Sequence, residues 1–168
     1  MIFLETMTIN IKTILYNSAA HKQMLDLRND ILRKPLGLSF IPAVFTPAAF
    51  KKEQQDILIG AFEVTKIVGC CVLTKVNERT IQLRQMAVNN DFQGKGVGKQ
   101  IVQYAEKIAQ EEKYETIMMH ARSVAVSFYK KLGYAIEGNE FTEVSIPHFM
   151  MKKNLKSCLK DHDNMERR

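Results

Sequence analysis

Hydrophobic residues recur along the chain at two spacings, and each spacing predicts a different element. Alternation of apolar and polar positions, or a short apolar run between turn residues, indicates a strand. The strands expected on this basis cover 8–15, 56–65, 67–75, 81–88, 115–120, 134–136 and 143–153, the last of them interrupted by Pro147.

Apolar residues at helical spacing predict helices over 21–32, 93–113 and 124–132, while 42–52 reads as a mixed loop or a short helix. The central helix carries an apolar stripe formed by Val97, Ile101, Ala105 and Ile108. The helix boundaries are marked by the cap and breaker residues Asn17, Ser18, Pro35, Gly37, Lys113, Ser123 and Gly133.

The strand over 81–88 changes phase within its length. Ile81 and Leu83 alternate as a half-buried strand should, and Met86 and Val88 continue in the opposite phase. A slip of one residue inside a strand is what a β-bulge produces. We therefore expect this strand to be bulged.

The order strand, helix, strand over 81–120 requires a crossover, so it predicts parallel pairing at the centre of the sheet. The pattern as a whole predicts an α/β (α+β) fold with a mixed, mostly antiparallel sheet of about seven strands and about four helices. No internal repeat is visible. We expect a single domain over 1–153 and a polar tail over 154–168.

Composition narrows the function class only modestly. The chain has 168 residues, of which 46% are hydrophobic and 25% charged, as is usual for a globular protein. The net charge of +6 suits an anionic ligand. The basic residues are spread along the chain and form no dense stripe interleaved with aromatics, so nucleic acid is not an expected partner.

The three cysteines have no spacing that resembles a zinc site or a disulfide framework, so we expect no metal and a reducing compartment. We find no signal peptide and no apolar run of membrane length, so the protein is expected to be cytoplasmic and to bind no membrane. Met7 is an alternative start to Met1, because the first strand pattern begins only at Thr8.

The stretch 93–99 reads Gln-Gly-Lys-Gly-Val-Gly-Lys between a strand and a helix, which is a phosphate-binding arrangement. It is not a Walker loop, because Gln93 stands where the first glycine belongs and Gln100 follows Lys99. It is not a Rossmann fingerprint either, because its glycines are equally spaced and lie after several strands.

Gln93, Gly96 and Gly98 do fill the Gln/Arg-x-x-Gly-x-Gly/Ala motif of the GNAT acyl-CoA N-acyltransferases, which the chain resembles from about residue 8 to 153. The resemblance implies acetyl-CoA as cosubstrate, with its pyrophosphate on the backbone of 93–99 and its pantetheine arm paired with a bulged strand. The residues implied in cofactor binding are Met86, Ala87, Val88, Gln93, Gly94, Lys95, Gly96, Val97, Gly98, Lys99, Arg122, Phe128 and Tyr129.

A second stretch, 122–134, resembles the family segment Asn-x-x-Ala-x-x-Phe-Tyr-x-x-x-Gly-Phe. Arg122 replaces the asparagine and Tyr134 the last phenylalanine. The resemblance implies that Tyr129 protonates the departing thiolate, and a phenol is able to do so at neutral pH. A core tyrosine that anchors the helix is the alternative.

Three side chains are candidates for the base that deprotonates the acceptor amine: His120, Glu143 and His148. The run Ile146-Pro147-His148 also resembles the ending of one GNAT subgroup. Each candidate has a structural alternative, since strand histidines and strand-end carboxylates are commonly satisfied surface or core groups. The adjacent Cys70 and Cys71 point to opposite faces of a strand, and we favour direct attack by the amine over a covalent intermediate.

The first helix region of the resembled subgroup closes over the acceptor site. Arg28 and Arg33 are therefore candidates to hold an acidic group of the acceptor, although both also fit as solvated arginines. The expected function is transfer of an acetyl group to a primary amine, with a small-molecule acceptor favoured. The alternative is a non-catalytic acyl-CoA-binding or sensory module. The resemblance also implies a homodimer through the terminal strands.

Overall fold

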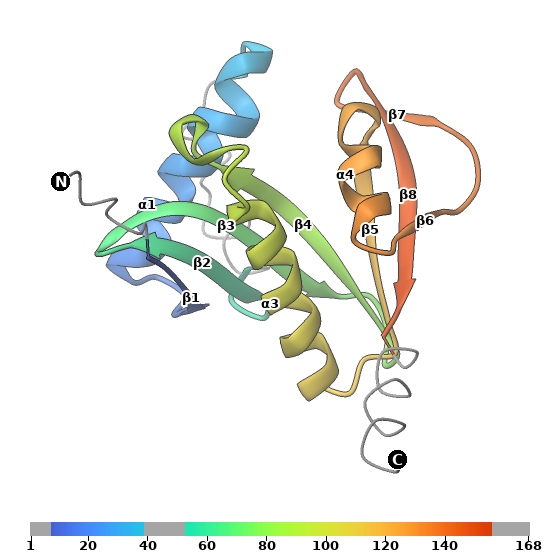
Figure 1. The fold of residues 1–168 in the computed structure, drawn as a ribbon, viewed down its shortest axis with the longest axis horizontal. Helices are drawn as coiled ribbons and strands as arrows, with labels where there is room; N and C mark the ends of the chain where they lie inside the picture. The colour runs from blue at the N-terminus through green and yellow to red at the C-terminus, as the bar shows by residue number, and fades with distance from the viewer. Residues whose placement is uncertain (1–7, 39–52, 156–168) are drawn as a thin grey trace, which may run out of the picture. The chain divides into compact units, whose positions relative to one another are not determined.

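The computed structural model describes residues 8–38 and 53–155, and the expected loop or short helix over 42–52 and the expected tail fall almost wholly outside them. Its eight strands form a sheet in the order β1-β2-β3-β4-β5-β8-β6, with β7 paired to β8 (Figure 1). The strands are β1 (Ile9–Ile14), β2 (Ile57–Glu63), β3 (Lys66–Lys75), β4 (Thr80–Val88), β5 (Thr116–Arg122), β6 (Ala135–Ile136), β7 (Phe141–Glu143) and β8 (Ile146–Asn154).

Three α-helices lie in the described part of the chain: α1 (Ala19–Arg28), α3 (Val97–Glu111) and α4 (Val126–Lys131). Shorter helical segments are the π-helix η1 (Asn29–Arg33) and the 3-10 turns η2 (Lys34–Leu36), η4 (Asn90–Phe92) and η5 (Ser123–Ala125). The chain divides into two compact units, and β3, β4 and α3 each pass from one unit into the other.

The first unit contains β1, α1, β2, most of β3, the end of β4 and the start of α3. Antiparallel pairing joins β1 to β2 and β2 to β3. The turn between β2 and β3 is Val64–Thr65, and Val64 has a φ of 55°. A positive φ at the first residue of a two-residue hairpin loop is typical of a type II′ turn.

Ser18 caps helix α1, as the sequence predicts, because its side chain accepts a hydrogen bond from the backbone N–H of His21 at 3.2 Å. The helix begins at Ala19, two residues before the predicted start. It ends earlier than expected. The predicted single helix over 21–32 becomes α1 to Arg28 followed by the π-helix η1. Pro35 and the left-handed Gly37 (φ 68°) then stop the helical path, as predicted.

Helix α3 approaches β3 closely through Gly69. A Cβ at Gly69 would lie 2.6 Å from Cδ1 of Ile101 and 3.3 Å from Cγ1 of Val97. Both of these helix residues are fully buried. The pairing of β2 with β3 also shifts register beside this point, between Ala61 and Phe62. Gly69 therefore marks the close backbone approach that glycine within a strand indicates.

We predict that Gly69→Ala lowers the free energy of unfolding by about 1–3 kcal/mol, because overpacking of a tight core displaces its neighbours. The measurement is chemical denaturation of the variant and the wild type. Ile101→Val removes the Cδ1 atom that the new methyl group would meet, so Gly69→Ala should cost less in that background. Equal costs in the two backgrounds would contradict the packing argument.

The second unit contains the start of β4, the end of α3, β5, α4 and β6 to β8. The predicted parallel pairing is confirmed, since Thr80 to Gln82 of β4 pair with Thr116 to Met118 of β5. Strand β5 also pairs antiparallel with β8 along its whole length, and α4 lies beside β5 (Figure 1).

The predicted single strand over 143–153 is wrong. A two-residue turn at Val144 and Ser145 divides it into β7 and β8, and both residues have positive φ (49° and 60°). Such a pair is typical of a type I′ turn, which ordinarily carries Asn or Gly. Pro147, the expected interruption, lies inside β8 and opposite Thr142.

Helix α4 also starts later than expected. The segment Ser123–Ala125 is a 3-10 turn, and the helix begins at Val126 without a side-chain cap. Ser123 does not cap it, because its hydroxyl instead donates to Glu140 Oε2 at 3.3 Å. The C-terminal end is as predicted, with Lys130 and Lys131 in the last turn and Gly133 at φ 91°.

Candidate functional site

Strand β4 ends in a loop whose conformation is fixed by hydrogen bonds from the side chains of the loop residues. The Asn89 side chain accepts from the N–H of Asp91 at 2.9 Å and caps η4. The Asn89 N–H donates to the Val68 carbonyl at 2.8 Å, which ties the strand end to β3. Gln93 Nε2 donates to the Val88 carbonyl at 2.9 Å and to Asn90 Oδ1 at 3.1 Å. The Gln93 side chain therefore serves to fold the loop.

Two glycines make the turn into α3. Gly94 and Gly96 have φ values of 72° and 81°, in the left-handed region that glycine adopts without strain. No described atom lies within 4 Å of the position a Cβ would take at either residue. Glycine is therefore required here by backbone conformation and not by close packing against the described residues.

The loop presents backbone N–H groups at the start of α3. The first bond of the helical ladder joins the Gln100 N–H to the Gly96 carbonyl at 3.1 Å. The amides of Val97, Gly98 and Lys99 precede that bond, and amides at this position favour an anion. Lys95 and Lys99 are exposed beside them and add positive charge. The arrangement fits a phosphate group.

Strand β4 is irregular just before the loop. Gln85 has a φ of 53°, a left-handed conformation inside a strand, which is the conformation of the first residue of a G1 bulge. The side chains do not follow the predicted change of phase, because the buried residues of β4 are Ile81, Leu83 and Ala87. Met86 and Val88 are half-buried. The irregular backbone lies where the sequence places it, but the side-chain pattern expected from it is absent.

Cys70 and Cys71 are both buried and free. Burial raises the pKa of the Cys70 thiol to about 12, although the nearby Arg28 charge acts in the opposite direction. Burial, together with the neighbouring Cys70, also holds the pKa of Cys71 well above its usual range. A thiol must ionise to act as a nucleophile. Neither cysteine is suited to a covalent acyl intermediate.

We predict that Cys70 and Cys71 resist a thiol reagent in the folded protein. A pKa of about 12 leaves roughly 1000-fold less thiolate than an ordinary cysteine has at pH 8. The rate of labelling should be measured in a Cys158→Ser background, with the guanidinium-unfolded protein as control. Fast labelling of either residue in the folded protein would contradict the prediction.

The three candidate bases meet at one carboxylate in the second unit. His120 Nδ1 lies 3.3 Å from Glu143 Oε2, and His148 Nε2 lies 4.0 Å from the same oxygen. Phe141 contacts both imidazole rings, with ring centroids 5.0 Å and 6.0 Å away. The His148 side chain is 9% exposed, whereas that of His120 is 31% exposed.

Hydrogen-bond partners assign the protons of this cluster. The Ile146 carbonyl can only accept, so His148 Nδ1, 2.8 Å away, carries a hydrogen. The carboxylate of Glu143 can also only accept, so His120 Nδ1 carries a hydrogen too. A neutral His120 then has its lone pair on Nε2. This is the orientation that a histidine general base requires.

Tyr129 is buried on α4 and packs edge-on against Phe128 and Tyr134, with ring centroids 4.9 Å and 5.8 Å away. Phe128 is half-buried. The Tyr134 hydroxyl donates to Glu106 at 2.9 Å, and Glu106 also binds Lys153. Tyr134 is thus a structural residue. Arg122 is half-buried at the end of β5, opposite His148 in β8.

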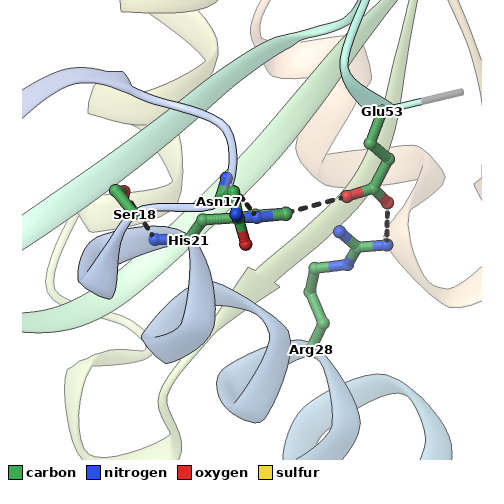
Figure 2. Close-up of polar contacts among 5 residues, drawn as sticks. All are labelled: Asn17, Ser18, His21, Arg28 and Glu53. Carbon is green, nitrogen blue, oxygen red and sulfur yellow. Dashed lines mark hydrogen bonds and ion pairs between the residues drawn. The ribbon is translucent and has the colours of Figure 1, made fainter. Parts of the chain in front are cut away.

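A second polar cluster, which no pattern in the sequence predicted, surrounds Arg28. Figure 2 shows Arg28 and His21 of α1 reaching the same carboxylate, that of Glu53. Arg28 Nη2 lies 2.7 Å from Glu53 Oε1, and His21 Nε2 lies 3.1 Å from Oε2. The Asn17 N–H donates to His21 Nδ1 at 3.1 Å. We name these residues, Asn17, His21, Arg28 and Glu53, the Arg28 cluster.

The Arg28 cluster is mostly buried. His21 is 3% exposed and Arg28 7%. Burial raises the pKa of Glu53, but hydrogen bonds and charge from Arg28 and His21 outweigh this and lower it below its usual range. A signal was present in the sequence, because His21, Met24 and Arg28 share one helical face with apolar residues. Nothing in the sequence pointed to Glu53. The other predicted acceptor residue, Arg33, is half-buried at the end of η1.

The predicted site residues thus fall into two groups. Residues 85–99 and the Arg28 cluster belong to the first unit, and Tyr129 and the three candidate bases His120, Glu143 and His148 belong to the second. No group of three or more His, Cys, Asp or Glu within 8–38 and 53–155 is arranged to hold a metal ion. The helices of the described residues include none that is long and apolar enough to cross a membrane.

The chain is similar to two curated proteins of Bacillus subtilis (strain 168). YyaT is 36% identical over 76 residues, which cover 45% of this chain and 51% of YyaT. A second protein, named as an acetyltransferase, is 31% identical over 105 residues, which cover 62% of this chain and 65% of that protein. The chain therefore spans about half to two thirds of the length of these relatives.

The fold is shared with a GNAT family acetyltransferase from Elizabethkingia anophelis, solved with acetyl-CoA bound. The TM-score is 0.65 at 16% identity, and the match covers 87% of this chain and 97% of the other. The family model described as an acetyltransferase (GNAT) domain matches residues 37–155, which is more than half of the chain. The loop after β4, the parallel pairing of β4 with β5 and this match agree, and the chain belongs to the GNAT acetyltransferase family.

Proposed function

We propose that the protein transfers the acetyl group of acetyl-CoA to a primary amine of a small molecule. The observation that carries the proposal is the loop from Gln93 to Lys99, where left-handed glycines, open backbone amides and two exposed lysines gather at the start of α3. The family match supports an acyl-CoA ligand at this loop. Acetyl-CoA supplies the activated thioester when bound.

Two backbone segments are proposed to bind this cosubstrate. The amides from Gln93 to Lys99 suit the pyrophosphate, because they lie at a helix N-terminus next to positive charge. The main chain of Met86, Ala87 and Val88 follows the irregular Gln85 and suits the pantetheine arm, which carries amide groups of its own. Arg122 and Phe128 complete the proposed binding residues.

We assign the acid and the base from the second unit. Tyr129 donates its phenolic proton to the leaving thiolate, and His120 Nε2 removes a proton from the acceptor amine. Glu143 keeps the proton of His120 on Nδ1 and so leaves Nε2 as the acceptor. His148 Nδ1 donates to the Ile146 carbonyl, and its Nε2 lies 4.0 Å from Glu143, beyond hydrogen-bond distance, so we assign His148 no part in the proton transfer. The raised pKa of both buried cysteines supports direct attack by the amine.

We predict that His120→Gln lowers kcat/KM by about 10²–10⁴-fold at neutral pH, which is the usual contribution of a general base. The rate of thiol release with a saturating amine, measured at neutral pH, checks the prediction. His148→Gln is the matched control and should keep the wild-type kcat/KM, because the His148 Nδ1 is bound to the Ile146 carbonyl. An equal loss in both variants would contradict the assignment.

The test of the proposed function is release of free thiol from acetyl-CoA by the purified protein, with and without a panel of primary amines. We expect release that depends on an amine. Binding of acetyl-CoA without any amine-dependent release would instead favour a non-catalytic acyl-CoA-binding module. A failure to bind acetyl-CoA would overturn the proposal at its first step.

A further inference from the structure

We propose that the Arg28 cluster is a carboxylate receptor, and that the acceptor is therefore a primary amine that also carries a carboxylate, as an amino acid does. The inference rests on the proposed function for the identity of the amine as acceptor. Three observations support it: Arg28 has buried donors without a partner among the described residues, Glu53 is bound to both Arg28 and His21, and the cluster lies beside β4.

Arg28 has more N–H hydrogen-bond donors than the described residues provide acceptors for. A guanidinium group carries five N–H donors, and the recorded contact is that of Nη2 with Glu53 at 2.7 Å. Nε and Nη1 are buried and have no hydrogen-bond partner within the described residues. A buried donor without an acceptor is costly, and more so on a charged group. The planar fork of arginine matches the two oxygens of a carboxylate.

Glu53 does not supply the missing acceptors, because its two oxygens bind Arg28 Nη2 and His21, and Arg28 Nε and Nη1 have no partner within the described residues. Oε1 accepts from Arg28 and Oε2 accepts from His21. His21 is fixed in turn, since its Nδ1 accepts from the Asn17 N–H and its Nε2 must carry the hydrogen. Glu53 therefore orients Arg28 and leaves its remaining donors for a second anion. The next residue, Asn29, also has a buried Oδ1 without a partner among the described residues.

The cluster lies next to the part of β4 that the proposed function assigns to the acyl donor. Arg28 and Glu53 both act electrostatically on the thiol of Cys70. That thiol donates a weak hydrogen bond to the Gln85 carbonyl, with sulfur and oxygen 3.9 Å apart. Met24 and Leu27, one turn and one residue before Arg28, pack in one core cluster with Cys70 and Ala87. A carboxylate on Arg28 would thus be held close to residues 85–87.

The test uses matched ligand pairs: L-amino acids and the corresponding amino acid amides, which share the amine and differ in the carboxylate. We expect the wild type to prefer the carboxylate by about 10- to 100-fold in kcat/KM, the range of hydrogen bonds to a charged group. Arg28→Lys should abolish the preference, because a lysine provides no fork. Glu53→Gln should raise it, because the competing negative charge is removed.

The two variants are expected to change the carboxylate preference in opposite directions, and this distinguishes a carboxylate receptor from general damage to the fold. Either substitution can lower stability, but a damaged fold does not increase the preference for a carboxylate. Isothermal titration of the same pairs into protein saturated with coenzyme A measures the preference without turnover. Equal binding of acid and amide by the wild type, or no binding of any amino acid, would overturn the receptor. Selective binding without thiol release would retain the receptor and overturn the proposed transferase.

Discussion

Gly96→Asp is expected to abolish measurable binding of acetyl-CoA. Gly96 has a φ of 81°, where an L-residue is strained. The new carboxylate would also place negative charge where the proposed pyrophosphate sits, beside the amides that open α3. The loss of even one charge-assisted hydrogen bond weakens binding by about 10- to 100-fold, and repulsion adds to it. The dissociation constant of acetyl-CoA, measured by calorimetry, checks the prediction.

The chain provides a matched control for this variant. Gly138 has the same φ of 81°, and no described atom lies within 4 Å of its Cβ position. Gly138→Asp therefore introduces the same charge and the same backbone strain at a place remote in sequence from the loop. It should lose a comparable amount of stability and keep its affinity for acetyl-CoA. A loss of affinity in both variants would show that the Gly96 effect is not local to the phosphate site.

Tyr129→Phe is expected to lower kcat by about 10²–10⁴-fold, the usual contribution of a general acid. The phenylalanine ring preserves the edge-on contacts with Phe128 and Tyr134, so the helix should keep its packing. The Michaelis constant for acetyl-CoA should change little, because the hydroxyl is proposed to act on the leaving group. Steady-state rates of thiol release with a saturating acceptor check the prediction.

Tyr134→Phe is the control for this second experiment. Tyr134 is equally buried, and its hydroxyl donates to Glu106 at 2.9 Å. Its removal should lower the free energy of unfolding by about 1 kcal/mol and leave kcat unchanged. If the two variants lose activity to the same extent, the role of Tyr129 is the support of the helix and not proton donation.

Local patterns in the sequence were sufficient for much of the fold. The alternating and continuous apolar runs predicted β2, β3 and β5, and helical periodicity predicted α3. The strand–helix–strand order predicted the parallel pairing of β4 with β5, because a crossover of that length allows little else. The glycines of the loop were visible for a similar reason, since a turn that requires positive φ selects glycine within a few residues.

The errors lie where the local signal was weak. The turn at Val144 and Ser145 has positive φ at both residues but none of the glycine or asparagine that marks such turns, so β7 and β8 were read as one strand. The π-helix after Arg28 shares its apolar spacing with an α-helix. Ser123 was read as a helix cap, whereas its hydroxyl bonds to Glu140, 17 residues away in sequence.

By itself, the sequence predicted most of the elements, the parallel pairing of β4 with β5 and the family to which the loop belongs. The tertiary structure alone decided which charged groups meet. Glu53 lies 32 residues from His21 and 25 from Arg28. Glu143 lies 23 residues from His120. No local periodicity connects such positions, because they are brought together by the pairing of strands and the packing of helices. Arg28 and His120 were candidates from the sequence, but the carboxylates that bind them became visible only in the folded chain.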